Sequence, residues 1–269
     1  MKLYHKIIIL NSIILSLFFS CNKKEDDIEY YKQSKNKYKV SYHFDNYDSV
    51  VVFYKNGKIF KTGKQDLNGK YFGKWNYYTT DEFLSNTQEF LIINKKVKLN
   101  QQWYYNIKGD TMYYGNKKFN IYNQKEFRED PNELKRSIFV RFGFIPEGDT
   151  LSISEPFKVL AEDGFPFWTN KDSESYVVLA KENYNFNSDF SNESQVKLDT
   201  FFCVERDKIN KGSFPNSDQK HTVAFGRWFV TPGKKELRGY MVEYCKNNII
   251  IEERRTYFEK IIYVKDTVK

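Results

Sequence analysis

His43 and Asp45 form the residue pair whose spacing most directly suggests chemistry. Residues two apart on a β-strand point to the same face, so this imidazole and carboxylate are placed as a metal pair requires. Two ligands are too few for a metal site, and the other downstream histidine, His221, stands just before an apolar stretch. We expect a half-exposed strand histidine at 43, a polar residue at the start of a strand at 221, and no metal.

Asn185, Asn187 and Asp189 place side-chain oxygens at every second position, as calcium-binding loops do. Phe190, however, occupies the position where the tight turn requires glycine, and Val196 stands where the loop requires its last acidic ligand. The pattern therefore favours a polar loop, and we expect no cofactor.

The sequence contains none of the short motifs that mark common enzyme classes. Gly-rich phosphate loops, His-Glu-x-x-His and Gly-x-Ser-x-Gly do not occur. The 35 Asp and Glu residues offer many carboxylate pairs for glycoside hydrolysis, but nothing selects one of them. We expect a non-enzymatic protein, and an enzyme that acts on glycans is the alternative.

Cys203 and Cys245 both lie in apolar, strand-like runs. In an oxidising compartment such a pair can form a disulfide, whereas neighbouring buried thiols are also common small hydrophobic residues. Both alternatives remain open at this point.

Three aromatic residues are candidates for contact with a ligand. Phe165, Phe167 and Trp168 surround Pro166 in a loop, where they are hard to bury. Flat aromatic faces stack well on sugar rings and on protein partners. We expect these residues to contact a protein or a glycan, with core packing as the alternative.

The first 20 residues have the composition of an export signal. A basic end at Lys2 is followed by the largely apolar residues 7–19, then Ser20 and Cys21. The apolar run is shorter than the about 20 residues that a helix needs to cross a bilayer. We therefore expect a cleaved targeting segment over residues 1–20.

This order of features resembles the signal of bacterial lipoproteins, although Phe18 stands where such signals usually carry Leu. The resemblance implies that Cys21 becomes the first residue and receives acyl chains, which anchor the protein to a membrane. The charged residues 22–27 resemble the signal that sends lipoproteins of the Bacteroidetes group to the outer face of the outer membrane. A solvated tether over residues 21–37 is the simpler interpretation of the same charges.

Composition limits the class and the partners of the remaining chain. With 40% hydrophobic and 18% aromatic residues the chain can form a packed core, and the mean hydropathy of −0.70 argues against further membrane spans. The net charge is +8, but the lysines are scattered through strand-like segments. We therefore expect no nucleic-acid partner.

Aromatic pairs beside glycine-containing turns recur within residues 38–122, as at Tyr54, Tyr78 and Tyr105. Such turns suit tight hairpins, and the flanking aromatic residues can pair across strands. The motifs at 53–57 and 73–78 resemble units of the MORN-repeat variant family. The resemblance implies a ribbon of stacked β-hairpins.

Residues 123–136 are rich in polar residues and are expected to form a linker. The segment 137–269 then contains seven or eight strand candidates, which predict a β-sandwich. Within it, residues 229–244 resemble the turn and late strand of immunoglobulin-like domains. We therefore expect an all-β protein, a MORN-like ribbon followed by a sandwich, that acts as a surface lipoprotein binding a partner.

Overall fold

The computed structural model describes residues 26–111, 139–163, 166–168, 172–181, 184–246 and 251–266. Over these residues the chain is all-β, as expected, and the helical element is the short 3-10 turn η2 (Glu193–Gln195). No helix among the described residues is long and apolar enough to cross a membrane. The expected signal segment 1–20, the expected acylation site Cys21 and the expected linker 123–136 lie outside the described residues.

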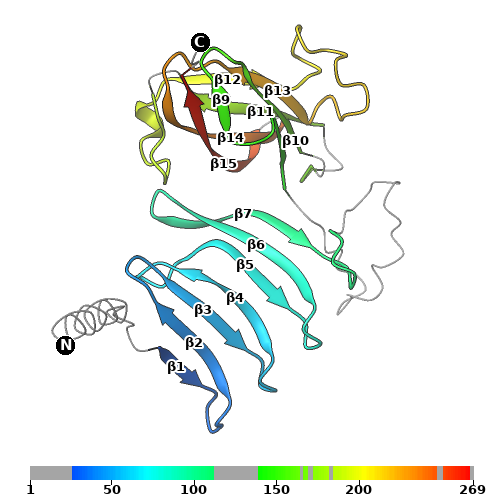
Figure 1. Cartoon of the computed structure of the whole chain (residues 1–269). Helices are drawn as coiled ribbons and strands as arrows, with labels where there is room; N and C mark the ends of the chain where they lie inside the picture. The colour runs from blue at the N-terminus through cyan, green and yellow to red at the C-terminus, as the bar shows by residue number, and fades with distance from the viewer. Residues whose placement is uncertain are drawn as a thin grey trace, which may run out of the picture.

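The N-terminal sheet is a meander of seven antiparallel strands that pair in sequence order (Figure 1). The strands are β1 (Asp27–Tyr30), β2 (Lys37–His43), β3 (Asp48–Phe53), β4 (Ile59–Gln65), β5 (Tyr71–Tyr78), β6 (Leu84–Ile93) and β7 (Lys96–Tyr104). This sheet, here called the ribbon, confirms the expected hairpin architecture. It begins earlier than expected, because residues 27–30 of the segment assigned to the tether pair with β2.

Tyrosine hydroxyl groups link successive hairpins of the ribbon. The hydroxyl of Tyr54 donates to the carbonyl of Tyr78 at 2.7 Å, and that of Tyr31 donates to the carbonyl of Phe53 at 2.6 Å. The aromatic repetition therefore has a structural cause, since a tyrosine at one turn binds the end of a neighbouring hairpin. Tyr31 belongs to this series although the sequence pattern did not include it.

The ribbon has a small core centred on Trp75. Its indole is fully buried with Val50 and Val52, and it stacks on Tyr71 with ring centroids 3.9 Å apart. Gly63 makes this position possible, because a Cβ there would lie 2.2 Å from Cδ2 of Trp75.

The C-terminal part is a sandwich of two sheets around one core. The smaller sheet has the order β13-β10-β8 and the larger β12-β11-β14-β15-β9. Their strands are β8 (Arg141–Ile145), β9 (Thr150–Ser152), β10 (Phe157–Glu162), β11 (Ser173–Ala180), β12 (Leu198–Phe202), β13 (Thr222–Arg227), β14 (Gly233–Lys246) and β15 (Ile251–Lys265). Alternating residues of the two sheets, such as Val159, Leu179 and Met241, meet in this core. The expected β-sandwich is confirmed at the level of architecture.

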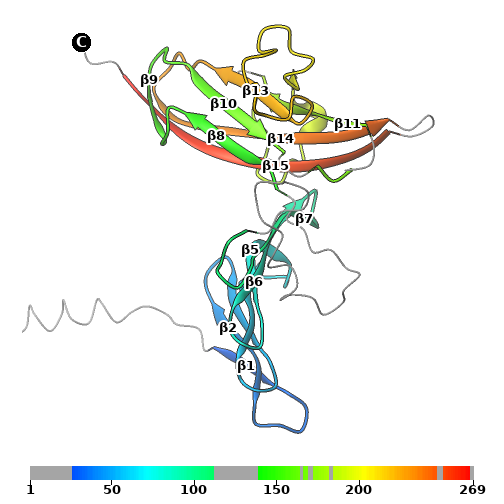
Figure 2. The same ribbon diagram turned by 90° about the vertical axis from the view of Figure 1, so that its right-hand side faces the viewer.

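A second hydrophobic cluster joins the sandwich to the ribbon. Ile93 of β6 belongs to the same buried cluster as Phe190, Tyr240 and Tyr257 of the sandwich. Figures 1 and 2 show β7 beside the sandwich and β1 at the far end of the ribbon. The two parts therefore share a packed junction.

Candidate binding site

A groove of about 880 Å³ lies on the sandwich where its two sheets meet. It is lined by β10 and β13 of the smaller sheet, by β12 of the larger sheet and by the loop that joins β12 to β13. This loop is drawn in yellow and gold in Figure 1. A volume of this size is typical of sites for small ligands.

Exposed apolar side chains surround the groove. Ile209 is 89% exposed, Trp228 and Ile145 are each 59% exposed, and Phe202 is 44% exposed, and all four line the groove. Scattered single apolar residues are ordinary on a protein surface, whereas a group of them around one hollow makes this groove the candidate binding site.

The floor of the groove reaches the core of the sandwich. Val159 and Phe225 line the groove and are also members of the buried cluster between the sheets. The groove therefore has apolar residues of the core at its floor, where an apolar ligand can be in contact with them.

Positive charge lies on the rim. Lys158 and Lys208 line the groove, and no ion pair of either lysine is found among the described residues. Arg206 on the same rim binds Glu174 at 3.2 Å and the hydroxyl of Tyr244 at 2.7 Å. The groove therefore combines an apolar floor with a rim of three cations, Lys158, Arg206 and Lys208, and one carboxylate, Asp207.

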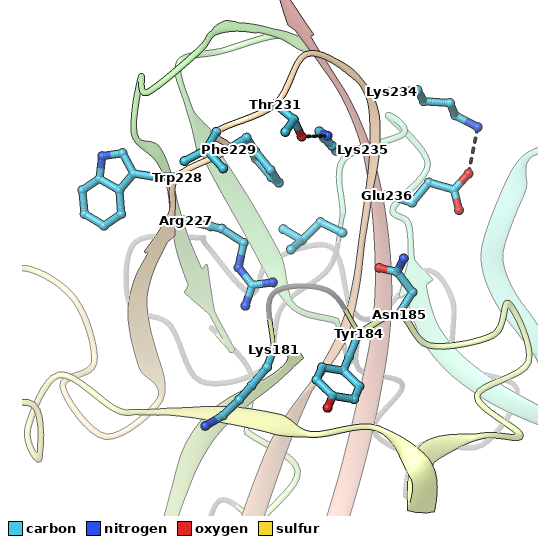
Figure 3. A pocket seen from close by; sticks show the side chains of 12 residues that line it. Lys181, Tyr184, Asn185, Arg227, Trp228, Phe229, Thr231, Lys234, Lys235 and Glu236 are labelled. Atoms are coloured by element: carbon cyan, nitrogen blue, oxygen red, sulfur yellow. Dashed lines mark hydrogen bonds and ion pairs between the residues drawn. The ribbon is translucent and has the colours of Figure 1, made fainter.

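A second hollow of about 400 Å³, here called the cleft, lies on the other side of Trp228 (Figure 3). Its lining is polar and includes Lys181, Arg227, Lys234 and Lys235. In Figure 3, Arg227 points into the cleft, whereas Trp228 points away from it. Trp228 lines both hollows, so the cleft and the groove are neighbours.

Ser173, His221 and Asp218 form a hydrogen-bonded row that resembles a catalytic triad in its distances. The Oγ atom of Ser173 lies 3.0 Å from Nε2 of His221, and Nδ1 of His221 lies 2.9 Å from Oδ2 of Asp218. Burial alone would lower the pKa of His221, but the hydrogen bond to Asp218 and nearby carboxylates outweigh it and raise the pKa. His221 immediately precedes β13, as expected, and it is also buried in a polar network.

The surroundings of this row favour a structural role. Ser173 donates to Oε1 of the buried Glu243 at 3.2 Å, so a protonated His221 can donate to Ser173 in turn. An imidazole in that state cannot take the hydroxyl proton, and a carboxylate beside Oγ opposes an alkoxide. The Nη1 atom of Arg254 lies 3.8 Å from Oε2 of Glu243 and 3.5 Å from Oδ2 of the buried Asp163. The positive charge of Arg254 therefore offsets the negative charges of these two carboxylates.

Glu243 also fixes the loop of predicted ligand-contact aromatics. Its two oxygens accept hydrogen bonds from the main-chain N–H of Phe167 at 2.8 Å and of Trp168 at 3.1 Å. The two rings contact edge to face with centroids 5.2 Å apart. Neither lines the groove or the cleft, and Phe165 lies outside the described residues.

The other predicted site residues have structural positions. Cys203 and Cys245 are both buried thiols, so the disulfide that the sequence left open is not formed between them. His43 bridges strands through Asp48 at 2.7 Å and Asp27 at 3.0 Å. Among the described residues, no group of three or more His, Cys, Asp and Glu side chains is arranged to hold a metal ion.

Sequence reasoning missed both Ile209 and Trp228. β13 ends at Arg227, so Trp228 lies just beyond the strand. Ile209 is an isolated apolar residue in a polar segment, which was the one available signal. No family model, curated protein or solved structure matches the chain.

Proposed function

We propose that this protein is a cell-envelope lipoprotein that binds an anionic amphiphile in the groove. The observation that carries the proposal is the set of exposed apolar side chains around a hollow that reaches the core and has a cationic rim. The acyl chain occupies the apolar floor, and its charged end lies near Lys158 and Lys208. The protein binds this ligand without turning it over.

The apolar groove can provide enough free energy for such binding. Each buried methylene group contributes about 0.8 kcal/mol. About ten of them contribute roughly 8 kcal/mol, which corresponds to a micromolar dissociation constant before ordering costs are subtracted. The rim lysines add selectivity for a negative charge more than affinity, since they lie in solvent.

The proposed lipid anchor and the ribbon determine where the groove lies relative to the membrane. In the proposal, acyl chains on Cys21 hold the protein at the outer face of the outer membrane, and the ribbon is a MORN-like spacer. Strands in a sheet lie about 4.8 Å apart, so the seven-stranded order places β1 roughly 30 Å from β7, which is beside the sandwich. The support for the anchor is the sequence resemblance at residues 1–27.

The rim charge can be tested with two amphiphiles that share one chain length. Calorimetry on the full chain carrying Cys21→Ser compares dodecanoate with dodecyltrimethylammonium below their micelle concentrations. We expect dodecanoate to bind at least tenfold more tightly. Equal affinity for both would contradict the role of the lysines, and binding of neither would contradict the groove as a site.

A further inference from the structure

We infer that the cleft beside Trp228 is a second binding site, which takes a saccharide carrying a carboxylate or a phosphate. It is a separate hollow with a polar lining, so the inference does not depend on amphiphile binding in the groove. Three features of the cleft support it: an excess of cations, a lysine bound to a neutral partner, and neutral hydrogen-bonding groups beside the cations.

The cations of the cleft outnumber the carboxylates that neutralise them. Asp199 pairs with two of them: its Oδ1 lies 3.7 Å from Nζ of Lys181, and its Oδ2 lies 3.3 Å from Nη2 of Arg227. Lys234 binds Glu236 at 2.8 Å, and the same carboxylate also binds Arg238 at 2.8 Å. Four cations, Lys181, Arg227, Lys234 and Lys235, line the cleft together with one carboxylate, Glu236, so an anion that enters it meets a positive potential.

Lys235 provides the most direct sign of an anionic ligand. Its Nζ donates to the hydroxyl of Thr231 at 2.6 Å, and no ion pair of this lysine is found among the described residues (Figure 3). A hydroxyl satisfies one of the three donors of an ammonium group and carries no charge. The remaining donors of Lys235 can bind an anion at the mouth of the cleft.

Neutral polar groups beside these cations point to a ligand with many hydroxyls. Asn185 and Tyr184 line the cleft and provide an amide and a phenol. An amide both donates and accepts hydrogen bonds, as neighbouring sugar hydroxyls require. The phenol ring offers a flat face, and the Nζ of Lys197 lies 5.5 Å from its centroid.

The cleft is held in shape by the sandwich. Leu237 lines it and is buried in the core between the sheets, and Phe229 packs against that core. The guanidinium of Arg227 is fixed by Asp199, so the ligand finds a cation already in position. Little ordering is then needed on binding, which preserves affinity.

Calorimetry on the full chain carrying Cys21→Ser tests this site with three probes. These are an oligogalacturonate, a neutral malto-oligosaccharide of the same length, and inorganic phosphate. We expect the oligogalacturonate to bind at least tenfold more tightly than either other probe, and its affinity to fall as salt rises. Equal binding of the neutral sugar would overturn the role of charge. Equal binding of phosphate would overturn saccharide recognition, and binding of no probe would overturn the site.

Single substitutions assign the binding to the cleft. Lys235→Gln should weaken oligogalacturonate binding about fivefold or more and leave dodecanoate binding unchanged, which separates this inference from the proposed function. Lys96→Gln, the same change on an exposed lysine of the ribbon, should have no effect. Equal affinity in Lys235→Gln and the parent chain would overturn the assignment.

Discussion

Asn100 of the ribbon forms two hydrogen bonds with the main chain of Tyr257 in the sandwich. Its side-chain N–H donates to the carbonyl of Tyr257 at 3.0 Å, and its side-chain oxygen accepts from the N–H of Tyr257 at 2.8 Å. Asn100 is buried, so both main-chain groups depend on it in place of water. The pair therefore joins two parts of the chain that are far apart in sequence.

Removing this amide should loosen the junction. Asn100→Ala leaves a buried donor and acceptor of Tyr257 without these partners, at a cost of about 1–3 kcal/mol. We expect a lower melting temperature by calorimetry and faster proteolysis between the ribbon and the sandwich. Asn68→Ala, at an exposed turn, is the matched control. An unchanged melting temperature for Asn100→Ala would show that the amide contributes nothing.

The contact between Gly63 and Trp75 gives a second stability test. A Cβ at position 63 would lie 2.2 Å from the indole, so the buried ring must move. We expect Gly63→Ala to destabilise the ribbon by about 1–3 kcal/mol. A Cβ at position 143 would lie 3.8 Å from its nearest neighbour, the carbonyl oxygen of Leu160, so Gly143→Ala should cost much less. Urea unfolding of both variants measures the difference, and equal losses would contradict the account.

The buried His221 makes stability depend on pH. Burial lowers the pKa of His221, but Asp218, Glu243 and Asp163 outweigh this effect and raise the pKa above its ordinary value of 6.5. A group with a raised folded pKa stabilises the protein fully below its unfolded pKa, and this contribution is lost as the pH rises through the folded pKa. The free energy of unfolding should therefore be higher at pH 6 than above the folded pKa.

Variants of His221 and His43 separate the contributions of these two residues to the pH dependence of stability. Hydrogen bonds with Asp48 and Asp27 also raise the pKa of His43, so its contribution has the same sign. His221→Gln should flatten the pH dependence more than His43→Gln, because His221 is buried in the network and His43 is not. Urea unfolding at several pH values measures both slopes. If the free energy of unfolding of His221→Gln changes with pH as steeply as that of the parent chain, His221 is not a source of the pH dependence.

The ribbon could be predicted from sequence because its signals are local. Asn56 and Gly57 mark one turn, and Gly57 adopts the positive φ of 84° that such a turn requires. The aromatic residues that pair with these turns, such as Tyr54, also lie within a few residues of them in the sequence. Tyr31 was missed because its turn over residues 32–36 contains no glycine and resembles a charged tether.

The groove could not be predicted because its parts come from distant segments. Ile145, Phe202 and Trp228 belong to three different regions of the sandwich, and no local pattern indicates that they meet. The hydrogen bond that holds Phe167 could not be predicted for the same reason. Its partner is Glu243, a carboxylate far along the chain that no single segment associates with it.

The lipid anchor can be tested apart from the fold. We expect the parent protein to incorporate labelled palmitate and to fractionate with membranes, and Cys21→Ser to lose both properties. Lys96→Gln, a change at an exposed residue outside the signal, is the control for effects on expression. If Cys21→Ser still incorporates palmitate, lipid is not attached at this residue and the proposed location fails.

Amphiphile binding is the central claim, and Ile209 tests it most directly. Ile209 is 89% exposed, so Ile209→Asp places a negative charge at the groove without disturbing the core. Leu67→Asp makes the same kind of change at a residue of the ribbon that is 62% exposed. Calorimetric titration with dodecanoate should give an affinity at least tenfold weaker for Ile209→Asp and unchanged for Leu67→Asp. If both variants bind dodecanoate as the parent chain does, the groove is not the binding site.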